Sequence, residues 1–321
     1  MIRRLLAFIA ALATTAALAQ GDYPNKPIKL IVPFPPAGGT DTLSRAIAQS
    51  ITNDTKWTIV VENRPGAGGN IGLDAAAKSP PDGYTIAMGQ TANLAVNPAL
   101  YSSMPYDPLK DFAPVSMVAV TPFALVTHPS FPAANAKEFV ALLRANPGKY
   151  TFATSGTGAT AHLVTELFNA MAQVQARHVP YKGSAPALAD VMNGEIGYAI
   201  ETVAATASHI KSGRVKTFGV STARRSAALP DVPPLAESAG LPQYDIAGWI
   251  GYAAPAGTPH EFVVRLSGEI RKALANDDLK ERMVSLGLDA VSTTPEEMAA
   301  YMRREQDRYG EIIRNANIRI E

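Results

Sequence analysis

The sequence has 321 residues, of which 47% are hydrophobic and 18% charged, and its formal net charge is +1. This composition provides enough apolar residues for folded cores, and the near-neutral charge argues against a protein that binds nucleic acid through a basic surface. The absence of cysteine excludes disulfides, thiolate-bound zinc, cysteine-ligated iron–sulfur clusters and a cysteine nucleophile.

The first 19 residues have the three parts of a secretory signal peptide. Arg3 and Arg4 form a basic start, Leu5–Leu18 is almost wholly apolar, and the run ending at Ala19 fits the small-residue cleavage pattern. The apolar run is too short to span a bilayer core of about 30 Å comfortably. We therefore expect residues 1–19 to be removed and an exported protein, starting near Gln20, to reside in a periplasm.

Short β-branched runs alternate with helical patterns in the first part of the mature chain. Strands are predicted at 28–34, 57–62 and 84–89, with helices at 40–53 and 70–78 between them. This order is typical of a parallel sheet with right-handed crossovers. Two further runs, 115–120 and 123–127, are separated only by Thr121 and Pro122, and they are interpreted as a strand pair.

The alternation continues to the C-terminus. Strands are predicted at 150–154, 176–179, 196–200, 215–221 and 248–253, and helices at 136–146, 161–172, 185–193, 202–212, 261–275 and 295–315. No repeat of fixed period is present. The pattern predicts an α/β fold, and the two successive halves suggest two similar lobes.

A glycine-rich corner follows the first strand. Pro33–Asp41 contains Gly38 and Gly39 at a strand-to-helix turn, where backbone N–H groups can approach a ligand and the helix presents its positive end. The alternative is a tight turn with Thr40 or Asp41 as the helix N-cap. The sequence leaves both interpretations open.

A second corner, Thr154–His162, has the same order of strand, small-residue loop and helix start. Gly156, Gly158 and Ala161 match the dinucleotide fingerprint G-x-G-x-x-A, but no acidic residue follows about 20 positions later. A serine-hydrolase elbow needs G-x-S-x-G, and Ser155 lacks the first glycine. The corner therefore supports neither of these two sites, and its helix start remains as a place for an anion.

Other glycine-rich and polar patterns give little evidence for a catalytic, nucleotide-binding or metal site. Gly66–Asn70 misses G-x-G-x-x-G because position 71 is Ile71, and it is interpreted as a helix start that packs closely on the sheet. His162 is expected to pack or hydrogen-bond within its own part of the fold rather than act as a base. The five histidines show no H-x-x-x-H or H-E-x-x-H spacing, so no metal site is predicted.

Several motifs follow one another in an order typical of a known family. They are Pro33–Asp41, Val61–Gly69, Pro81–Tyr84, Pro105–Asp107, Lys110–Phe112, Ser155–Gly158 with His162, Val179–Gly183, Leu229–Pro233, Trp249 and Pro255–Pro259. Over essentially the whole mature chain, the sequence resembles the Bug or TctC-like receptors, the extracytoplasmic solute-binding proteins of tripartite tricarboxylate transporters. Pro36 stands where the family commonly has Ala or Gly, and Glu201 stands near where many members have Asp.

The resemblance implies a two-lobed, type II periplasmic-binding-protein fold, in which each lobe is a mostly parallel sheet flanked by helices. Lobe 1 would comprise residues 20–121 and 248–321, and lobe 2 residues 122–247, with the ligand cleft between them. The first glycine corner then falls in lobe 1 and the second in lobe 2. Two helix N-termini facing each other would suit an anion with two acidic ends.

The resemblance also implies a set of ligand-binding residues. They are Pro35, Pro36, Gly38, Gly39, Thr40, Asp41, Gln90, Ser155, Gly156, Thr157, Gly158, His162, Tyr181, Lys182, Glu201 and Thr202. We expect Tyr181 and Lys182 to close one wall, and Glu201 and Thr202 to contact the far end of the ligand, such as an amino or hydroxyl group. Backbone donors rather than Lys182 are expected to hold the carboxylate. No catalytic residue, metal or cofactor is expected.

The function implied is capture of a small carboxylate in the periplasm and its delivery to the membrane permease of a tripartite transporter. The ligand would be a di- or tricarboxylate, an acidic amino acid or an aromatic acid, and the protein a monomer that is not an enzyme. One alternative is a sensor that feeds a signalling receptor. Another is an exported hydrolase using Ser155 with His162.

Overall fold

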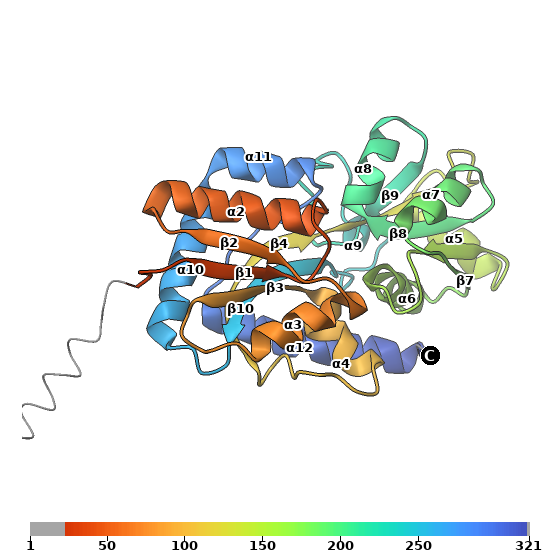
Figure 1. Cartoon of the computed structure of the whole chain (residues 1–321). Coiled ribbons are helices and arrows are strands. Elements are labelled where there is room, and N and C mark those ends of the chain that lie inside the picture. Colours follow the sequence, from red (N-terminus) through yellow and green to blue (C-terminus); the bar gives the residue numbers. More distant parts are fainter. Residues whose placement is uncertain (1–22, 320–321) are drawn as a thin grey trace, which may run out of the picture.

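The computed structural model describes residues 23–319, which form two lobes, each built on one β-sheet with helices packed against it (Figure 1). The predicted signal peptide, residues 1–19, lies outside the described residues. Within residues 23–319, no helix combines the length and the apolar character needed to cross a membrane.

The first lobe contains a six-stranded sheet in the order β11-β4-β10-β3-β1-β2. Its strands are β1 (Ile28–Val32), β2 (Ile59–Asn63), β3 (Thr85–Gln90), β4 (Phe112–Thr121), β10 (Gly248–Pro255) and β11 (Asp289–Ala290). Its helices are α2 (Gly39–Thr55), η1 (Ala67–Gly69), α3 (Asn70–Ala77), η2 (Ala92–Val96), α4 (Asn97–Leu100), α10 (His260–Ala275), α11 (Asp277–Ser285) and α12 (Pro295–Asn315).

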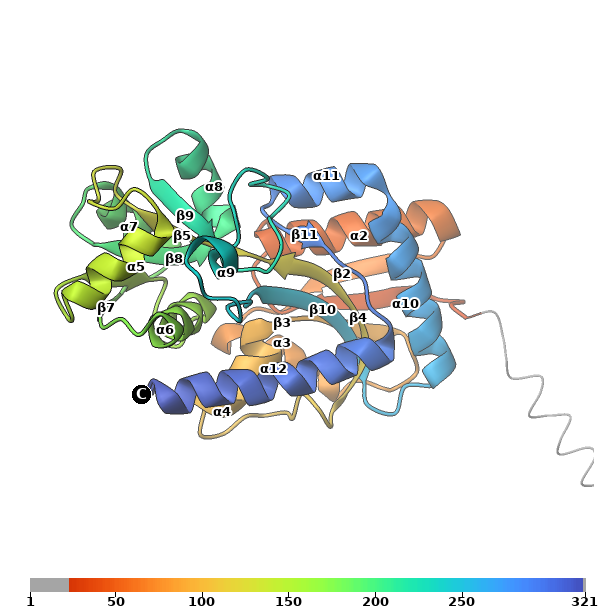
Figure 2. The same ribbon diagram turned by 180° about the vertical axis from the view of Figure 1, so that it is seen from behind.

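Different helices cover the two faces of this sheet (Figures 1 and 2). Leu30 and Val32 of β1 belong to the core cluster that includes α2, α10 and α11, whereas Ile31 belongs to the cluster that includes α3 and α12. Successive residues of a strand point to opposite faces, so this alternation requires apolar cover on both sides. β10 shows the same requirement, since all of its residues are buried.

The second lobe contains a five-stranded sheet in the order β7-β6-β8-β5-β9. Its strands are β5 (Phe123–Thr127), β6 (Thr151–Thr154), β7 (Arg177–Pro180), β8 (Tyr198–Thr202) and β9 (Lys216–Val220). Its helices are α5 (Ala136–Ala145), α6 (Thr160–Ala172), α7 (Ser184–Met192), α8 (Val203–Lys211) and α9 (Leu235–Ser238). Phe139 and Phe168 pack on one face of the sheet, and Leu188 and Val203 pack on the other.

The strand pairings correct two expectations. Both sheets are mixed rather than mostly parallel, because β10 runs antiparallel to β3 and β4, and β5 runs antiparallel to β8 and β9. The strands β4 and β5 do not pair with each other, since they belong to different sheets. Only Pro122 separates them, and a hairpin normally needs a loop of at least about two residues. The chain therefore continues from one sheet directly into the other.

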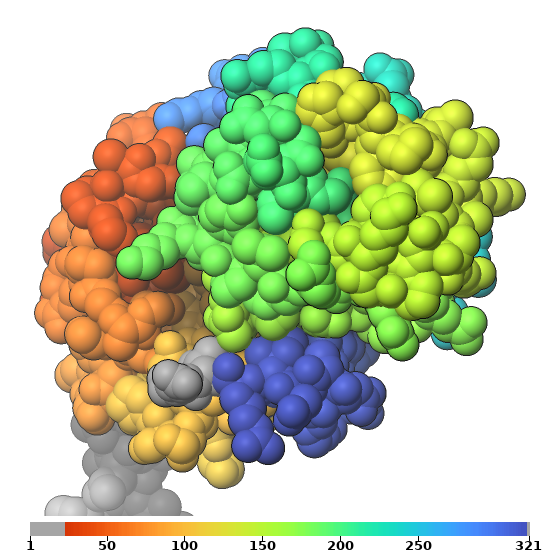
Figure 3. All heavy atoms as spheres, turned by 90° about the vertical axis from the view of Figure 1, so that its right-hand side faces the viewer, coloured from red at the N-terminus to blue at the C-terminus, as the bar shows by residue number. Residues whose placement is uncertain are grey.

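The lobes also touch each other away from these connections. Helix α12 packs against β4 of the first lobe and α6 of the second, and it lies beneath the second lobe in Figure 3 (dark blue). The carboxylate of Asp289 in β11 accepts hydrogen bonds from the Ala227 N–H at 2.9 Å and the Ser226 hydroxyl at 3.3 Å. Gly287, just before β11, lies against the backbone of Ala204 in α8. These contacts tie the position of one lobe to that of the other.

Candidate functional site

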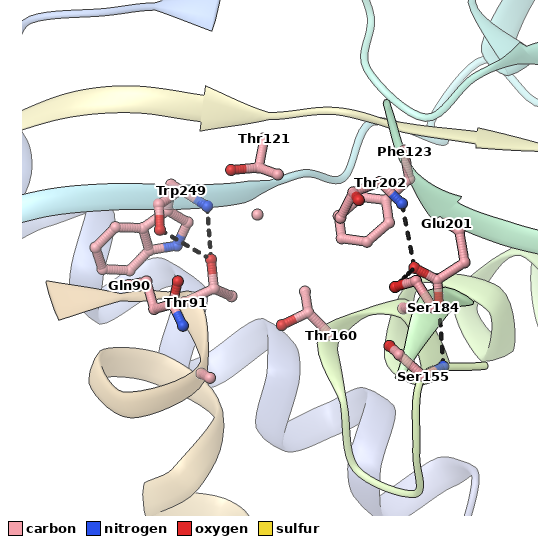
Figure 4. Close-up of a pocket in the computed structure, with 13 residues that line it drawn as sticks. Gln90, Thr91, Thr121, Phe123, Ser155, Thr160, Ser184, Glu201, Thr202 and Trp249 are labelled. Carbon is pink, nitrogen blue, oxygen red and sulfur yellow. Dashed lines mark hydrogen bonds between the residues drawn. The ribbon is translucent and has the colours of Figure 1, made fainter. Parts of the chain in front are cut away.

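A cavity of about 190 Å³ lies between the lobes, where strand ends and helix starts from both sheets meet (Figure 4). It is smaller than the roughly 300–1,000 Å³ of pockets for drug-sized ligands, so it suits a ligand of few heavy atoms. The residues lining it are Gln90, Thr91, Ala92, Thr121, Phe123, Ser155, Thr160, Ala161, Ser184, Glu201, Thr202, Gly248 and Trp249.

The start of α6 brings unpaired backbone donors to this cavity. Thr160 and Ala161 are the first two residues of the helix, and their N–H groups make no hydrogen bond to any residue in the described part of the chain. The N-cap, Ala159, has no side-chain oxygen to satisfy them, and the first turn contains no acidic residue. Free N–H groups at the positive end of a helix dipole favour an anion.

Glu201 is the one ionisable side chain among these lining residues, and it is 1% exposed. Its Oε1 accepts from the Ser155 N–H at 2.9 Å, and its Oε2 accepts from the Ser184 hydroxyl at 2.9 Å and the Thr202 N–H at 3.3 Å (Figure 4). Burial raises the pKa of Glu201, and the hydrogen bonds from Ser184 and Ser155 oppose that rise. The second-lobe wall therefore contains a carboxyl group that is already surrounded by donors.

The wall from the first lobe combines hydroxyl groups with a buried indole. The backbone N–H of Trp249 donates to Thr91 Oγ1 at 2.6 Å, which fixes the end of β3 against the start of β10 (Figure 4). Trp249 is 1% exposed, and its indole Nε1 has no hydrogen-bond partner among residues 23–319. Thr121 completes this wall at the end of β4. This side can therefore offer neutral hydrogen-bonding groups but no formal charge.

Four of the sequence-predicted site residues line the cavity. They are Gln90, Ser155, Glu201 and Thr202, and they come from β3, the loop after β6 and the end of β8. Parallel pairing places β6 beside β8, which brings Ser155 to Glu201 although 46 positions separate them. The end of one strand thus supplies the acceptor and the end of its neighbour supplies the donor.

The first glycine corner lies outside the cavity lining. Its residues Pro35, Pro36, Gly38 and Gly39 are exposed, and Thr40 is half-buried. Asp41 is buried and accepts hydrogen bonds from the Ala37 N–H at 2.9 Å, Arg45 Nε at 3.0 Å and Asn63 Nδ2 at 2.9 Å. This carboxylate holds the turn before α2 in place, and the ligand-binding role predicted for these residues stays a prediction.

The second corner reaches the cavity with only part of its loop. Gly156, Thr157 and Gly158 are not among the lining residues. The N–H of Gly158 donates to His162 Nδ1 at 3.2 Å, and the buried His162 ring stacks on His178 with centroids 3.8 Å apart. His162 thus hydrogen-bonds and packs within its own lobe, as expected, and its contact with a ligand remains a prediction.

Tyr181 and Lys182 also stand away from the lining. The Tyr181 hydroxyl donates to the Asp190 carboxylate at 2.6 Å, and Lys182 is exposed. Burial and the bond to Asp190 raise the pKa of Tyr181 to about 12. Their predicted role as one wall of the site stays a prediction.

The geometry gives no support to metal binding or to serine hydrolysis. Within residues 23–319, no group of three or more His, Asp or Glu side chains is placed to hold a metal ion. A serine nucleophile needs a base within hydrogen-bond reach. Ser155 and His162 are not hydrogen-bonded to each other, because His162 Nδ1 accepts from Gly158 and its Nε2 lies 3.5 Å from Glu166.

Sequence reasoning missed most of the lining residues. They are Thr91, Ala92, Thr121, Phe123, Thr160, Ala161, Ser184, Gly248 and Trp249. Thr121 and Phe123 flank the connection between the sheets, and Thr160 begins the helix after the second corner. The predicted elements therefore already marked the places where these three residues lie. Ser184 carried no local signal, because only the pairing of β6 with β7 and β8 brings the start of α7 to Glu201.

Comparison with known proteins identifies close relatives of this chain. The family model described as tripartite tricarboxylate transporter family receptor, TctC, matches residues 43–318. BugT of Bordetella pertussis is 37% identical over 323 residues, which cover 99% of each chain.

Solved structures of related proteins share this fold. The R. palustris protein Rpa4515, solved with adipate, is 34% identical with a TM-score of 0.77, covering 93% of this chain and 99% of that one. The periplasmic binding protein BugD is 32% identical with a TM-score of 0.73, covering 93% of this chain and 100% of its own. The two-lobed architecture is therefore that of periplasmic binding proteins of the TctC type.

Proposed function

Since the chain belongs to the TctC family of tripartite tricarboxylate transporter receptors, we propose that it captures a small carboxylate in the cavity between its lobes and delivers it to the membrane permease of such a transporter. Its relatives include a periplasmic binding protein, so the proposed place of capture is the periplasm. The adipate in the R. palustris relative supports a carboxylate as the ligand class.

The observation that carries this proposal is the start of α6. Thr160 and Ala161, whose N–H groups are unpaired within residues 23–319, line the cavity, and no Lys, Arg or His is among the lining residues. Charge-assisted bonds from several backbone donors, each contributing about 1.5–3 kcal/mol, can hold a carboxylate without a formal cation. The sequence-based expectation that backbone donors outweigh Lys182 is kept, and we assign these donors to the start of α6.

Thermal unfolding in the presence of organic acids tests the ligand class. An acid present at about 100 times its dissociation constant should stabilise the protein by about 2.7 kcal/mol. The methyl ester or amide of the same acid is the control, and it should stabilise far less because it lacks the anion. A screen in which no organic acid raises the melting temperature would contradict the proposal.

Substitution at the start of α6 tests the proposed donors. Thr160→Pro removes the N–H at the first helical position, where proline is well tolerated, and the preceding Ala159 already has the extended backbone that proline requires (ψ 153°). Thr160→Ala is the matched control, since it removes the hydroxyl but keeps the N–H. Calorimetry should show Thr160→Pro binding about tenfold or more weakly than Thr160→Ala, the loss expected for a charge-assisted bond.

Deletion of the gene in the organism that encodes it tests delivery. Loss of uptake of the identified acid supports a transport receptor. Intact uptake together with loss of a transcriptional response to the acid would instead support a sensor.

A further inference from the structure

A second cavity between the lobes has a volume of about 960 Å³ and shares no residue with the smaller one. In the first lobe it touches β11 and the helices α10, α11 and α12, and in the second lobe it touches the segment 222–227 and Asp245 (Figure 2). Its volume is at the upper end of the roughly 300–1,000 Å³ of sites for small organic ligands. The proposed capture of a carboxylate makes no use of it.

The two cavities lie on opposite sides of the connections between the lobes. The chain crosses from one sheet to the other at Pro122, after β4, and at Ala247, before β10. In the first sheet β4 and β10 are neighbours, with β3 beyond β10 and β11 beyond β4. The smaller cavity reaches β3 through Gln90, and the larger one reaches β11 through Asp289. A rotation about the two connections that narrows one cavity therefore widens the other.

The lining of the larger cavity has a surplus of positive side chains. Six of its residues are cationic, four from the first lobe and two from the second, against three acidic residues. The cationic residues are Arg224, Arg225, Arg271, Lys280, Arg304 and Arg308. Five of them are exposed, and Arg308 is half-buried. An anion that enters this cavity can therefore meet cations from both lobes at once.

The three acidic residues of this lining already have partners. Asp289 accepts the two hydrogen bonds from the second lobe described above. Asp245 accepts from the Ala223 N–H at 2.9 Å, and Glu305 Oε1 lies 3.8 Å from a guanidinium nitrogen of Arg308. With all three acids ionised, six cations against three acids leave the lining a formal charge of +3.

Two arginines, one from each lobe, are available to bind an anion. Arg224 belongs to the second lobe and Arg271 to α10 of the first. Within residues 23–319, neither side chain forms a hydrogen bond or an ion pair. The planar guanidinium group matches the geometry of an oxyanion and can bind it through two parallel hydrogen bonds. The cavity therefore offers one such group on each side of the gap between the lobes.

Apolar side chains also contribute to this lining. They are mainly Leu274, Val284, Val291 and Tyr301. The guanidinium of Arg304 lies over the Tyr301 ring, 4.8 Å from its centroid, so a cation and an aromatic face occur side by side. A ligand that matches both kinds of surface has an apolar body and anionic groups at its ends.

We propose that the larger cavity binds an amphipathic dianion, an apolar body with an anionic group at each end, and that the bound dianion weakens capture of the carboxylate ligand. One anionic group meets Arg224 and the other meets Arg271. The dianion draws the lobes together beside β11, and this movement opposes closure of the lobes beside β3. The coupling rests on the proposed function, whereas the site for the dianion does not.

Calorimetry with naphthalene-1,5-disulfonate tests the site directly. This probe has an aromatic body, two anionic groups and no carboxylate. At about 0.15 M salt it should bind the wild-type protein at least about fivefold more tightly than naphthalene-1-sulfonate, the control with a single anionic group. Equal binding of the two sulfonates, or no binding of the disulfonate, would overturn the site.

Variants in both lobes test whether one molecule bridges them. Arg224→Ala and Arg271→Ala should each weaken binding of the disulfonate by about fivefold or more. Arg177→Ala in the second lobe and Arg303→Ala in the first are the matched controls, because both arginines are exposed and lie outside the lining. They should keep the wild-type affinity within about twofold. Circular dichroism checks that all four variants are folded, and a loss confined to one lobe would overturn the bridge.

The coupling is measured with an organic acid identified by thermal unfolding. Saturating disulfonate should weaken binding of the acid by about fivefold or more, and saturating acid should weaken the disulfonate by the same factor, because coupling between two sites is reciprocal. Thr160→Pro, which alters the smaller cavity, should bind the disulfonate as the wild-type protein does. Weaker binding of the disulfonate to this variant would mean that the probe occupies the smaller cavity, and it would overturn the proposal.

The site and the coupling fail in different ways. If the disulfonate binds but leaves the affinity for the acid unchanged, the coupling is wrong and the site stands. If no organic acid binds, the proposed function fails and the coupling falls with it, while the comparison of the two sulfonates still decides the site.

Discussion

A methyl group added at Gly287 should push the two lobes apart at a point close to the cavity. A Cβ on this residue would lie 2.5 Å from both the N and the Cα of Ala204, and 3.0 Å from its Cβ. Ala204 follows the cavity residue Thr202 by two positions in α8. Because the nearest atoms are backbone atoms, no side-chain rotation relieves the overlap, and one lobe must move.

The loss of stability expected for Gly287→Ala has two separable contributions. Gly287 has φ +69°, where alanine is disfavoured by roughly 1–2 kcal/mol. Atoms normally approach to about 3.5–4.0 Å, so relief of the overlap needs a shift of about 1 Å, and such overpacking costs about 1–3 kcal/mol. We therefore expect Gly287→Ala to reduce the free energy of unfolding by about 2–5 kcal/mol.

Gly213→Ala isolates the contact between the lobes. Gly213 has the same φ of +69°, but a Cβ there would meet nothing within 4 Å. Urea unfolding should show that Gly213→Ala loses only the backbone contribution, about 1–2 kcal/mol. Calorimetry with an identified acid should show weaker binding only for Gly287→Ala, by about tenfold, since a shift of about 1 Å moves the Thr202 end of the cavity.

Two results would contradict the proposed role of the contact between Gly287 and Ala204. If both alanine variants lose the same stability and bind the acid equally well, the approach of Gly287 to Ala204 does not control the distance between the lobes. Tighter binding by Gly287→Ala would mean that the bound protein holds its lobes farther apart at this contact.

Three further outcomes follow from the structure. Gly72→Ala in α3 should lower the melting temperature, because its Cβ would lie 2.6 Å from Pro33 Cβ and 2.7 Å from a backbone oxygen, whereas Gly268→Ala in α10 meets nothing within 4 Å and should stabilise by about 0.5–1 kcal/mol. Burial and the neighbouring His162 lower the pKa of His178 to about 4. Between pH 6.5 and 4, the His178 imidazole therefore binds a proton in the unfolded chain but stays neutral in the folded chain. The free energy of unfolding should therefore fall between pH 6.5 and 4, by at most about 1.4 kcal/mol per pH unit from this group, and urea unfolding of His178→Gln should lack that part of the dependence. Saturating ligand should reduce the radius of gyration measured by X-ray scattering, and an unchanged profile with binding confirmed separately would count against closure of the lobes.

The helices and strands were predicted well where the local sequence signals, such as helix caps, were strong. Helix α12 has the bounds expected from the sequence, Pro295–Asn315, because Thr294 and Glu297 form a capping box and Pro295 occupies the first turn. The helical segment formed by η2 and α4 was missed, since it contains two asparagines and Pro98 and begins with π-type hydrogen bonding. Its start supplies Thr91 and Ala92 to the cavity, so this error also hid part of the site.

The identity of the residues that form the cavity walls depends on strand pairings, which no local sequence pattern encodes. Trp249 carried a family motif, yet its position on the cavity follows from β10 lying between β3 and β4. Ser184 reaches Glu201 only because α7 starts beside the end of β8. Residues of this kind become visible once the strand order is known, because the register then fixes which loops share an edge.

One difference between the two glycine corners was present in the sequence and indicates which of them can take an anion. Both corners lead from a strand into a helix, but the first turn of α2 contains Asp41 and the first turn of α6 contains no acid. Asp41 accepts from the Ala37 N–H, as Glu201 accepts from the Ser184 hydroxyl at the start of α7 and the Thr202 N–H at the N-cap of α8. A helix start that is supplied with a carboxylate by its own chain has less positive potential left for a ligand. The start of α6 keeps that potential, because Ala159 cannot cap it and His162 engages only the Gly158 N–H, and this is the physical reason to place the ligand carboxylate there.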